Sequence, residues 1–269
     1  MEILNNNLKN KIREIIVKQL NYNNYQLLAN KLTEFVDILY KKIPDEKRIS
    51  YGIVYTIKLL SEFIFNLLSK ENLPVLEISK KLYDNSQEFK SKAVALGMLS
   101  FYGVKDYTPV LPFFIKSANS DFWNEREITA IFFRKLIKKY PNEMKNFLSS
   151  LVNSDSPYIR RFIAETLRPV QENRWFFKNI EYPLSIIEHL FKEAHPYPRT
   201  SVGNNLSDIS KKLPEVVFKV IKELVSFNNK NSYWIAYRAC RNLVKKYPER
   251  VKELLNITEY KYKKKIYKL

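Results

Sequence analysis

The sequence predicts an all-α protein built as a continuous stack of helical hairpins, an α–α superhelix. Only four glycines occur among 269 residues, whereas a β-rich or α/β chain of this length needs more turns that tolerate positive φ. Apolar residues recur instead at three- and four-residue spacing, as in the run Ile128, Ile131, Phe132 and Leu136, which is the period of a helix with one buried face. A short basic motif that ends in proline also occurs three times.

The apolar spacing divides the chain into helices separated by short breaks. Helices are expected at 6–20, 23–42, 46–69, 74–84, 86–102, 106–118, 122–140, 142–152, 156–168, 181–194, 198–213, 214–227, 231–247 and 248–255. The segment 170–180 interrupts the pattern, and we expect a connecting or functional loop there. The segment 260–269 is mostly Lys and Tyr and is expected to be a frayed basic arm.

The motif Lys-Lys-x-Pro, followed by an acidic residue and an apolar helical pattern, marks an internal repeat at 138–141, 211–214 and 245–248. The second and third copies lie 34 residues apart, and the first and second lie 73 apart, close to two such units. Cations favour the end of one helix, and proline suits the first turn of the next. A two-helix unit of this length predicts a HEAT-like helical-repeat solenoid. We expect one domain over 1–269, with divergent helices at 1–85, clearer repeats at 86–256 and a basic tail at 257–269.

The chain is strongly basic, with 46 Lys and Arg against 28 Asp and Glu and a formal net charge of +18. Such an excess indicates an anionic partner, and nucleic acid comes first because neutralising phosphates releases counterions. A lysine bias from an AT-rich genome is the alternative, since Asn, Ile, Lys and Tyr are all abundant. That bias explains scattered lysines better than it explains clustered arginines.

Several classes of protein are excluded. The single cysteine, Cys240, excludes a disulfide framework and indicates a reducing compartment, so we expect a cytoplasmic, nucleoid-associated protein. The polar N-terminus does not look like a signal peptide, and no apolar stretch suits a membrane. His189 and His195 have no partners at metal-ligand spacing, and no phosphate-binding loop motif occurs. We therefore expect no metal and no cofactor, and an enzyme of this sequence must rely on carboxylates and aromatic rings.

The first of three segments that could carry chemistry is 123–127. Trp123 and Glu127 lie four residues apart there and share one helix face. The alternative is that Trp123 belongs to the core and that Arg126 and Glu127 form an exposed charged pair.

The second and third segments are 158–175 and 199–208. Arg161, Glu165 and Arg168 lie along one helical stripe, where the arginines would keep the carboxylate ionised; the alternative is a structural ladder of salt bridges. Gly203 and two asparagines interrupt a helical pattern at a cost in stability. Either a neighbouring helix or a ligand must then approach closely at Gly203.

Together these segments resemble the AlkC and AlkD group of HEAT-like-repeat DNA glycosylases, the DNA alkylation repair family. The motifs that carry the resemblance are Trp-x-x-Arg-Glu at 123–127, Arg-Arg-x-x-x-Glu-x-x-Arg-Pro at 160–169 and Ser-Val-x-Asn-x-Leu-x-Asp-Ile-Ser-Lys at 201–211. The similarity covers about 90–256 and is closer to AlkC. We expect no C-terminal immunoglobulin-like domain, although some AlkC proteins carry one.

The resemblance implies excision of positively charged N3- or N7-alkylated bases, such as 3-methyladenine, from double-stranded DNA in base excision repair. By position, Glu127, Glu165 and Asp208 would be catalytic, and Trp123 and Trp175 would contact the substrate. The chemistry is consistent with this, because a departing cationic base leaves an oxocarbenium-like sugar. Nearby carboxylates stabilise that charge and can position a water.

Arginines spread from residue 126 to residue 241 would then contact DNA phosphates, because equivalent positions of successive repeats line one face of a solenoid. They are Arg126, Arg160, Arg161, Arg168, Arg199, Arg238 and Arg241. The sequence departs from the family at Thr166, where glycine is usual, and in a link from Arg168 to Trp175 that is two residues longer than usual.

Two other functions fit the same sequence. A protein of this fold could bind DNA structures without excising bases, or it could be a protein-interaction scaffold, and the fold alone does not decide. Arginines clustered on one face would favour DNA, whereas scattered arginines would favour a scaffold. In each case we expect a monomer.

Overall fold

The computed structural model describes residues 3–48 and 52–261, and every regular element within these ranges is helical. The chain divides into two compact units, Met1–Leu136 and Ile137–Leu269, each packed mainly against itself. The all-α fold class is confirmed, whereas the expectation of a single domain stays a prediction.

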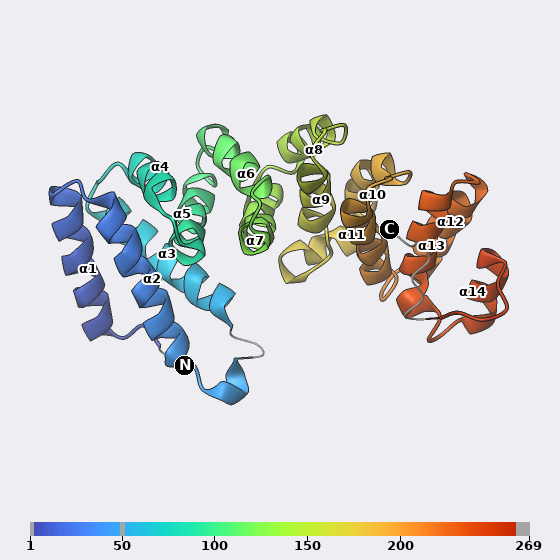
Figure 1. Cartoon of the computed structure of the whole chain (residues 1–269), viewed down its shortest axis with the longest axis horizontal. Helices are drawn as coiled ribbons and strands as arrows, with labels where there is room; N and C mark the ends of the chain where they lie inside the picture. Colours follow the sequence, from blue (N-terminus) through green and yellow to red (C-terminus); the bar gives the residue numbers. More distant parts are fainter. Residues whose placement is uncertain (1–2, 49–51, 262–269) are drawn as a thin grey trace. The chain divides into compact units, whose positions relative to one another are not determined.

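Helices drawn from blue to green in Figure 1 form the first unit. They are α1 (Asn6–Asn21), α2 (Tyr25–Lys41), α3 (Ile53–Lys70), α4 (Val75–Asn85), α5 (Phe89–Tyr102), α6 (Leu111–Ala118) and α7 (Trp123–Lys139), with short 3-10 helices η1 (Asp45–Lys47) and η2 (Thr108–Val110). The unit boundary falls near the C-terminal end of α7.

Helix α5 is the centre of the first unit, packed against both α3 and α4. Its residues from Ala93 to Ser100 are all buried, as expected for a helix that is apolar on every side. Gly97 allows the close approach of α3, since a Cβ at this position would lie 2.5 Å from the Cβ of Ser61.

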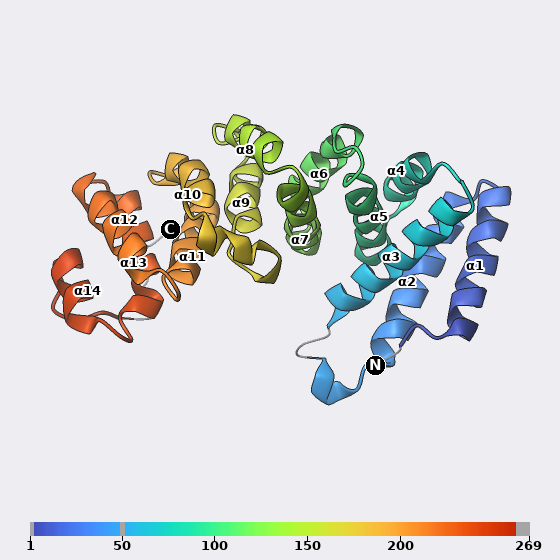
Figure 2. The same ribbon diagram turned by 180° about the vertical axis from the view of Figure 1, so that it is seen from behind.

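The second unit contains α8 (Pro141–Ser150), α9 (Pro157–Thr166), α10 (Glu181–Ile187), α11 (Pro196–Ile209), α12 (Pro214–Ser226), α13 (Lys230–Leu243) and α14 (Pro248–Leu255), with 3-10 helices η3 (Gln171–Lys178) and η4 (Glu188–Leu190). Helices α9, α11 and α13 pack side by side in one layer. Helix α8 packs on α10, and α12 packs on α14 and on α13, the last helix of that layer (Figures 1 and 2). The predicted helical hairpins are therefore present.

The proline motif separates these hairpins with one recurring backbone turn. Pro141, Pro214 and Pro248 begin α8, α12 and α14, as predicted. The residues before them have φ of −129°, −124° and −134° and ψ of 64°, 63° and 54°. The sequence repeat thus corresponds to a repeated local structure.

Asparagine takes the place of glycine at the tight turns of this chain. The described residues other than glycine with positive φ are Asn23, Asn72, Asn228 and Asn256. Asparagine tolerates the left-handed region because its short side chain hydrogen-bonds locally. The low glycine count therefore predicts helices correctly, although the chain still contains left-handed turns.

Three expectations about local structure are wrong. The helix expected at 46–69 begins at Ile53, and 49–51 lie outside the described residues. The expected loop at 170–180 contains η3, because Asn173 Nδ2 donates hydrogen bonds to Thr166 O at 2.7 Å and Arg168 O at 3.0 Å and so ties the segment to the end of α9.

The third wrong expectation concerns the first two residues of the arm expected at 260–269, which contact α13 and are not frayed. The ring of Tyr260 stacks on Tyr237 of α13 at 4.4 Å, and its hydroxyl donates to Tyr237 O at 2.8 Å. Tyr237 also accepts a hydrogen bond from the backbone of Lys261 at 2.7 Å. The rest of the expected arm, 262–269, lies outside the described residues.

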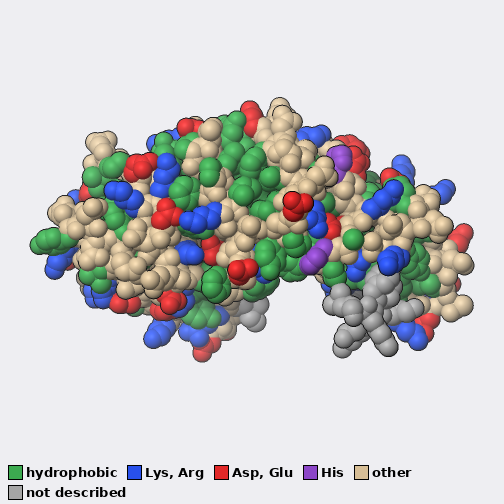
Figure 3. Space-filling model, turned by 45° about the horizontal axis from the view of Figure 1, so that its top comes forward, with side chains coloured by type: hydrophobic (Ala, Val, Ile, Leu, Met, Phe, Trp, Pro, Cys, Tyr) green, Lys and Arg blue, Asp and Glu red, His purple; other side chains and the backbone are tan. Residues whose placement is uncertain are grey.

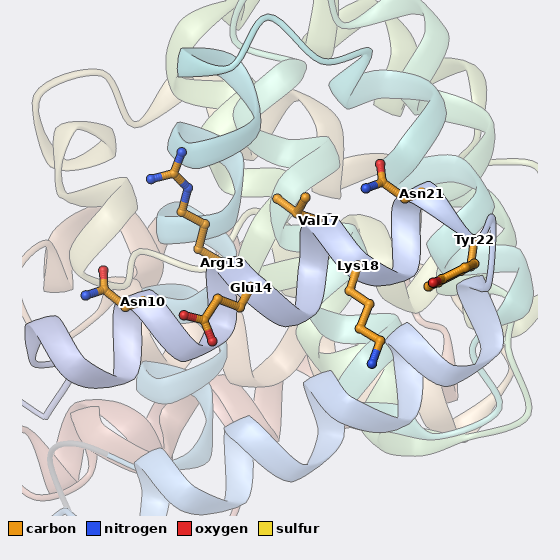
Figure 4. Close-up of a pocket in the computed structure, with 7 residues that line it drawn as sticks. All are labelled: Asn10, Arg13, Glu14, Val17, Lys18, Asn21 and Tyr22. Atoms are coloured by element: carbon orange, nitrogen blue, oxygen red, sulfur yellow. The ribbon is translucent and has the colours of Figure 1, made fainter.

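The outer face of α1 carries an open depression of about 790 Å³. Figure 4 shows the side chains that line it, which are Asn10, Arg13, Glu14, Val17, Lys18, Asn21 and Tyr22. None of the predicted site residues lies there. Within the described ranges, no helix has the length and apolar character needed to cross a bilayer.

Candidate nucleic-acid interface and acidic cluster

In the second unit, the predicted stripe of Arg161, Glu165 and Arg168 meets a second carboxylate, Asp208 of α11. Arg168 joins the two, because its Nη1 lies 3.3 Å from Glu165 Oε2 while its Nε and Nη2 donate to Asp208 Oδ2 at 3.0 and 2.6 Å. Helices α9 and α11 are neighbours in one layer, which is how residues 40 apart in sequence meet. The structure thus brings Glu165, Arg168 and Asp208 into one group, the acidic cluster.

Glu165 lies at the buried end of the acidic cluster, with 4% of its surface exposed. Ser201 of α11 donates to Glu165 Oε1 at 2.6 Å, and Arg161 Nη2 lies 3.5 Å from the same oxygen. The ladder expected from Arg161, Glu165 and Arg168 is present as two ion pairs. Since both oxygens are engaged inside the protein, Glu165 is suited to orient Arg168 rather than to face a ligand.

Asp208 is the more accessible acid, with 19% of its side chain exposed. Besides Arg168, the ammonium group of Lys211 donates to Asp208 Oδ1 at 2.7 Å. Partial burial alone would raise the pKa of Asp208, but the hydrogen bonds from Lys211 and Arg168 outweigh it and hold the pKa below its usual range. An ionised carboxylate therefore remains near the surface at neutral pH.

Arg160 and Arg199 stabilise the loops that precede their own helices. Arg160 Nη1 donates to Ser154 O at 2.6 Å, and Arg199 Nη1 donates to Ala194 O at 3.3 Å. Arg160 also binds Glu193 with two hydrogen bonds, of 2.6 and 3.1 Å. The similar placement of these arginines in successive hairpins therefore has a local structural role.

On α13, Arg238 and Arg241 converge on one neutral oxygen. Arg238 Nε and Arg241 Nη1 lie 2.9 and 3.3 Å from Asn204 Oδ1, and the guanidinium carbon of Arg238 lies 5.5 Å from the ring centroid of Trp234. A Cβ on Gly203 would lie 2.8 Å from the Cβ of Arg238. The close approach expected at Gly203 is therefore made by a neighbouring helix.

The two positions at which the sequence departs from the resembled family, Thr166 and the link to Trp175, lie in different parts of the second unit. Thr166 is fully buried, and its hydroxyl donates to Phe162 O at 2.9 Å, so it is satisfied within its own helix. Trp175 belongs to η3, where its ring packs on Phe176 and Tyr182 at 4.6 and 5.0 Å. This packing favours a supporting role for Trp175 in the wall of η3.

The remaining predicted site residues belong to the first unit, and they are Trp123, Arg126 and Glu127. Trp123 is 58% exposed at the start of α7 while Arg126 is 8% exposed, so the alternative of a core tryptophan beside an exposed pair is wrong. Glu127 is half-buried. The buried acid of this segment is instead Glu125, which accepts hydrogen bonds from the Tyr83 hydroxyl at 2.6 Å and Ser120 at 2.8 Å.

Several of the arginines expected to contact phosphates are enclosed by protein. Arg126, Arg161 and Arg199 expose only 8%, 8% and 5% of their surface. Figure 3 shows basic side chains interspersed with acidic and hydrophobic ones on the face that it draws. Most of the capacity to reach a phosphate must therefore come from cations other than these three.

The sequence did not identify two polar partners of the acidic cluster, Ser201 and Lys211, as site residues. Both stand in the third motif, but spacing alone does not show that Ser201 faces α9 across 36 residues. Among residues 3–48 and 52–261, no group of three or more His, Cys, Asp or Glu side chains is placed to hold a metal ion.

No family model and no curated protein matches this chain, whereas solved structures do. AlkD2 from Streptococcus mutans has 21% identity and a TM-score of 0.58, over 78% of this chain and 97% of AlkD2. An alkylpurine DNA glycosylase, AlkC from Pseudomonas fluorescens bound to DNA containing an abasic-site analogue, has 19% identity and a TM-score of 0.60, over 91% of this chain and 68% of AlkC.

A third structure, smu.31 from Streptococcus mutans UA159, has 19% identity and a TM-score of 0.52, over 86% of this chain and 96% of its own. The predicted fold resemblance is confirmed by these three structures. The chain has the HEAT-like helical-repeat fold of AlkC and AlkD2.

Proposed function

We propose that this chain is a DNA glycosylase that removes positively charged N3- or N7-alkylated bases, such as 3-methyladenine, from double-stranded DNA. The observation that carries the proposal is the acidic cluster, in which a partly exposed, ionised Asp208 is fixed by Arg168 to a buried Glu165. The likeness in fold to an alkylpurine DNA glycosylase bound to DNA supports the choice of DNA as the partner.

The reaction breaks the bond between C1′ of deoxyribose and the base nitrogen. The bonding electrons go to the base, which leaves neutral because it carried the positive charge, and positive charge develops on the sugar. Water then adds at C1′ and gives up a proton, leaving an abasic sugar. A fixed carboxylate stabilises the charge on the sugar and can accept the proton of the water.

In this scheme Asp208 faces the sugar, and Glu165 is a positioning residue that holds Arg168. Burial would lower the pKa of Arg168, but the charges of Glu165 and Asp208 outweigh it and raise the pKa above its usual range. The guanidinium therefore stays charged and keeps the Asp208 carboxylate in one place. Preorganisation of this kind lowers the cost of reaching a charged transition state.

The aromatic and acidic residues of the first unit belong to the proposal as substrate contacts. The exposed indole of Trp123 offers a face to a cationic base, and Glu127 shares the first turns of the same helix.

A base-release experiment tests the proposal. Methylated duplex DNA is incubated with the protein, and free 3-methyladenine is measured for wild type, Asp208→Asn and Glu165→Gln. We expect each substitution to abolish release, with a loss of about 100-fold or more, while DNA affinity changes little. Glu165→Asp, which keeps the charge, should recover part of the rate if Glu165 acts by positioning Arg168.

Glu215→Gln is the matched control. Glu215 forms an exposed ion pair with Arg250 at 2.7 Å, in the same unit but outside the acidic cluster, so its loss should leave the rate unchanged. Equal release rates in wild type, Asp208→Asn and Glu165→Gln would refute the assignment of the site.

One observation favours a second function, DNA-structure binding without excision. Both carboxylates are already ion-paired, and Glu165 is almost sealed from solvent. This alternative predicts that the wild-type protein binds DNA in a salt-sensitive manner and releases no base from methylated duplexes.

A further inference from the structure

A recess of about 350 Å³ opens beside the acidic cluster, between η3 and the turn that joins α11 to α12. Its charged and aromatic lining consists of Arg168, Arg174, Lys211, Lys212, Asp208 and Phe177. The volume is at the lower end of the range for small-ligand pockets, about 300–1,000 Å³. The recess can therefore hold a group larger than a single ion.

The lining of the recess has an excess of positive charge. Four cations face one carboxylate, and that carboxylate is already shared by Arg168 and Lys211. Arg174 and Lys212 are exposed, so their charges are available to a ligand. A compact anion with several acceptor oxygens satisfies such a set, and phosphate is the common biological group of this kind.

The walls of the recess are held in place by contacts across the second unit. Asn173 ties η3 to the end of α9, and Arg168 is fixed by two hydrogen bonds to Asp208. The ammonium of Lys212 lies 4.8 Å from the ring centroid of Phe177, which links η3 to the turn after α11. The cations are thus presented by anchored elements.

The cationic lining continues into the next hairpin. A neighbouring recess of about 170 Å³ shares Lys211 and is also lined by Lys245 and Lys246. The Lys-Lys-x-Pro motif that marks the repeat therefore supplies cations to both recesses. A ligand with regularly spaced charges fits this arrangement better than an isolated ion does.

We propose that the recess beside Asp208 is a phosphate subsite that takes a backbone phosphate of the DNA strand whose sugar faces that carboxylate. The inference that the phosphate belongs to DNA rests on the proposed function. The inference that the recess binds a phosphate at all rests on the charged residues that line it. Arg174 and Lys212 are the phosphate contacts, and Phe177 supports Lys212.

Salt-dependent DNA binding tests the subsite. The double variant Arg174→Gln/Lys212→Gln is compared with Lys219→Gln/Lys222→Gln, which removes two exposed charges from α12 outside the recess. Binding of a fluorescent, unmethylated duplex is measured by anisotropy over a series of salt concentrations. Each phosphate contact contributes a slope of about −0.9 to the plot of log affinity against log salt, so the recess variant should lose about one unit of slope and the control should not.

Two further ligands separate the sources of phosphate. Inorganic phosphate and a 5′-deoxynucleotide are tested for thermal stabilisation of each protein at matched ionic strength. One result would overturn the DNA assignment and assign the recess to a free phosphate compound. In that result, either ligand stabilises the wild type but not the recess variant, while the two double variants have equal slopes in the DNA-binding plot. Equal slopes and no stabilisation would overturn the subsite altogether.

The base-release assay keeps this inference distinct from the proposed function. Loss of slope in the recess variant supports the subsite even if the wild type releases no base, in which case the glycosylase proposal fails alone. Base release by the wild type with an unchanged slope in the recess variant would support the glycosylase proposal and overturn the DNA phosphate subsite.

Discussion

Replacing Gly203 with alanine would test whether α11 and α13 pack as closely as the structure shows. A Cβ at position 203 would lie 2.8, 3.0 and 3.3 Å from the Cβ, Cγ and Cδ atoms of Arg238. The nearest of these atoms is fixed to the backbone of α13 and cannot rotate away. The two helices would have to separate by several tenths of an ångström.

Two opposing free energies set the size of the effect. Overpacking a well-packed site costs about 1–3 kcal/mol, whereas replacing glycine by alanine inside a helix gains about 1 kcal/mol. The net loss in free energy of unfolding should be about 1 kcal/mol, with about 2 kcal/mol as the upper end. For a chain of this size, that corresponds to a Tm lower by about 2–4 °C per kcal/mol.

A double-mutant cycle with Arg238→Gly isolates the clash, because that change removes all three of the crowding atoms. In the Arg238→Gly background, Gly203→Ala should stabilise the protein by about 1 kcal/mol through helix propensity alone. The measurement is urea unfolding followed by tryptophan fluorescence in a Trp123→Phe background, which leaves Trp175 and Trp234 as reporters of the second unit. A higher stability of Gly203→Ala in the wild-type background would refute the close packing.

Two further predictions concern the acidic cluster. The pKa of folded Asp208 lies below its usual value, so its ionised form stabilises the second unit above about pH 4. This contribution is lost as the pH falls through the lower folded pKa. Asp208→Asn should therefore flatten that part of the acid unfolding curve, and superimposable curves for wild type and variant would contradict the prediction. Ser201→Ala removes a buried hydrogen bond to Glu165 and should cost about 1–3 kcal/mol in urea unfolding. The exposed Ser226→Ala serves as its control and should show no measurable change.

The fold could be predicted because its signals are local. Three- and four-residue spacing of apolar side chains and proline at the first turn both act within a few residues, and the helices lie where these signals place them. The start of α3 and the folded segment η3 could not be predicted in this way. The latter depends on Asn173 reaching the carbonyl groups at the end of α9, a contact that composition does not encode.

The candidate site could be predicted only as far as contacts along one helix. The stripe formed by Arg161, Glu165 and Arg168 follows from helical spacing, and both ion pairs are present. Burial is different, because it depends on which neighbouring helix covers the stripe. The sequence could not show that Ser201 covers Glu165 while Asp208 remains accessible.

The division of work between arginine and lysine bears on the origin of the basic charge. Arginine has a planar group with five donors, which suits fixed contacts with carbonyl and carboxylate oxygens, and Arg160 and Arg168 are used in this way. Lysine carries a mobile point charge at the surface, and Lys212 adds such a charge to a recess that is lined by four cations and one carboxylate. A lysine bias of the genome would add lysines without regard to position. It does not account for a Lys-Lys pair that recurs before Pro141, Pro214 and Pro248, where cations favour the end of the preceding helix. The second and third of these pairs also line adjoining recesses, an arrangement that suits the phosphate-bearing partner that we propose.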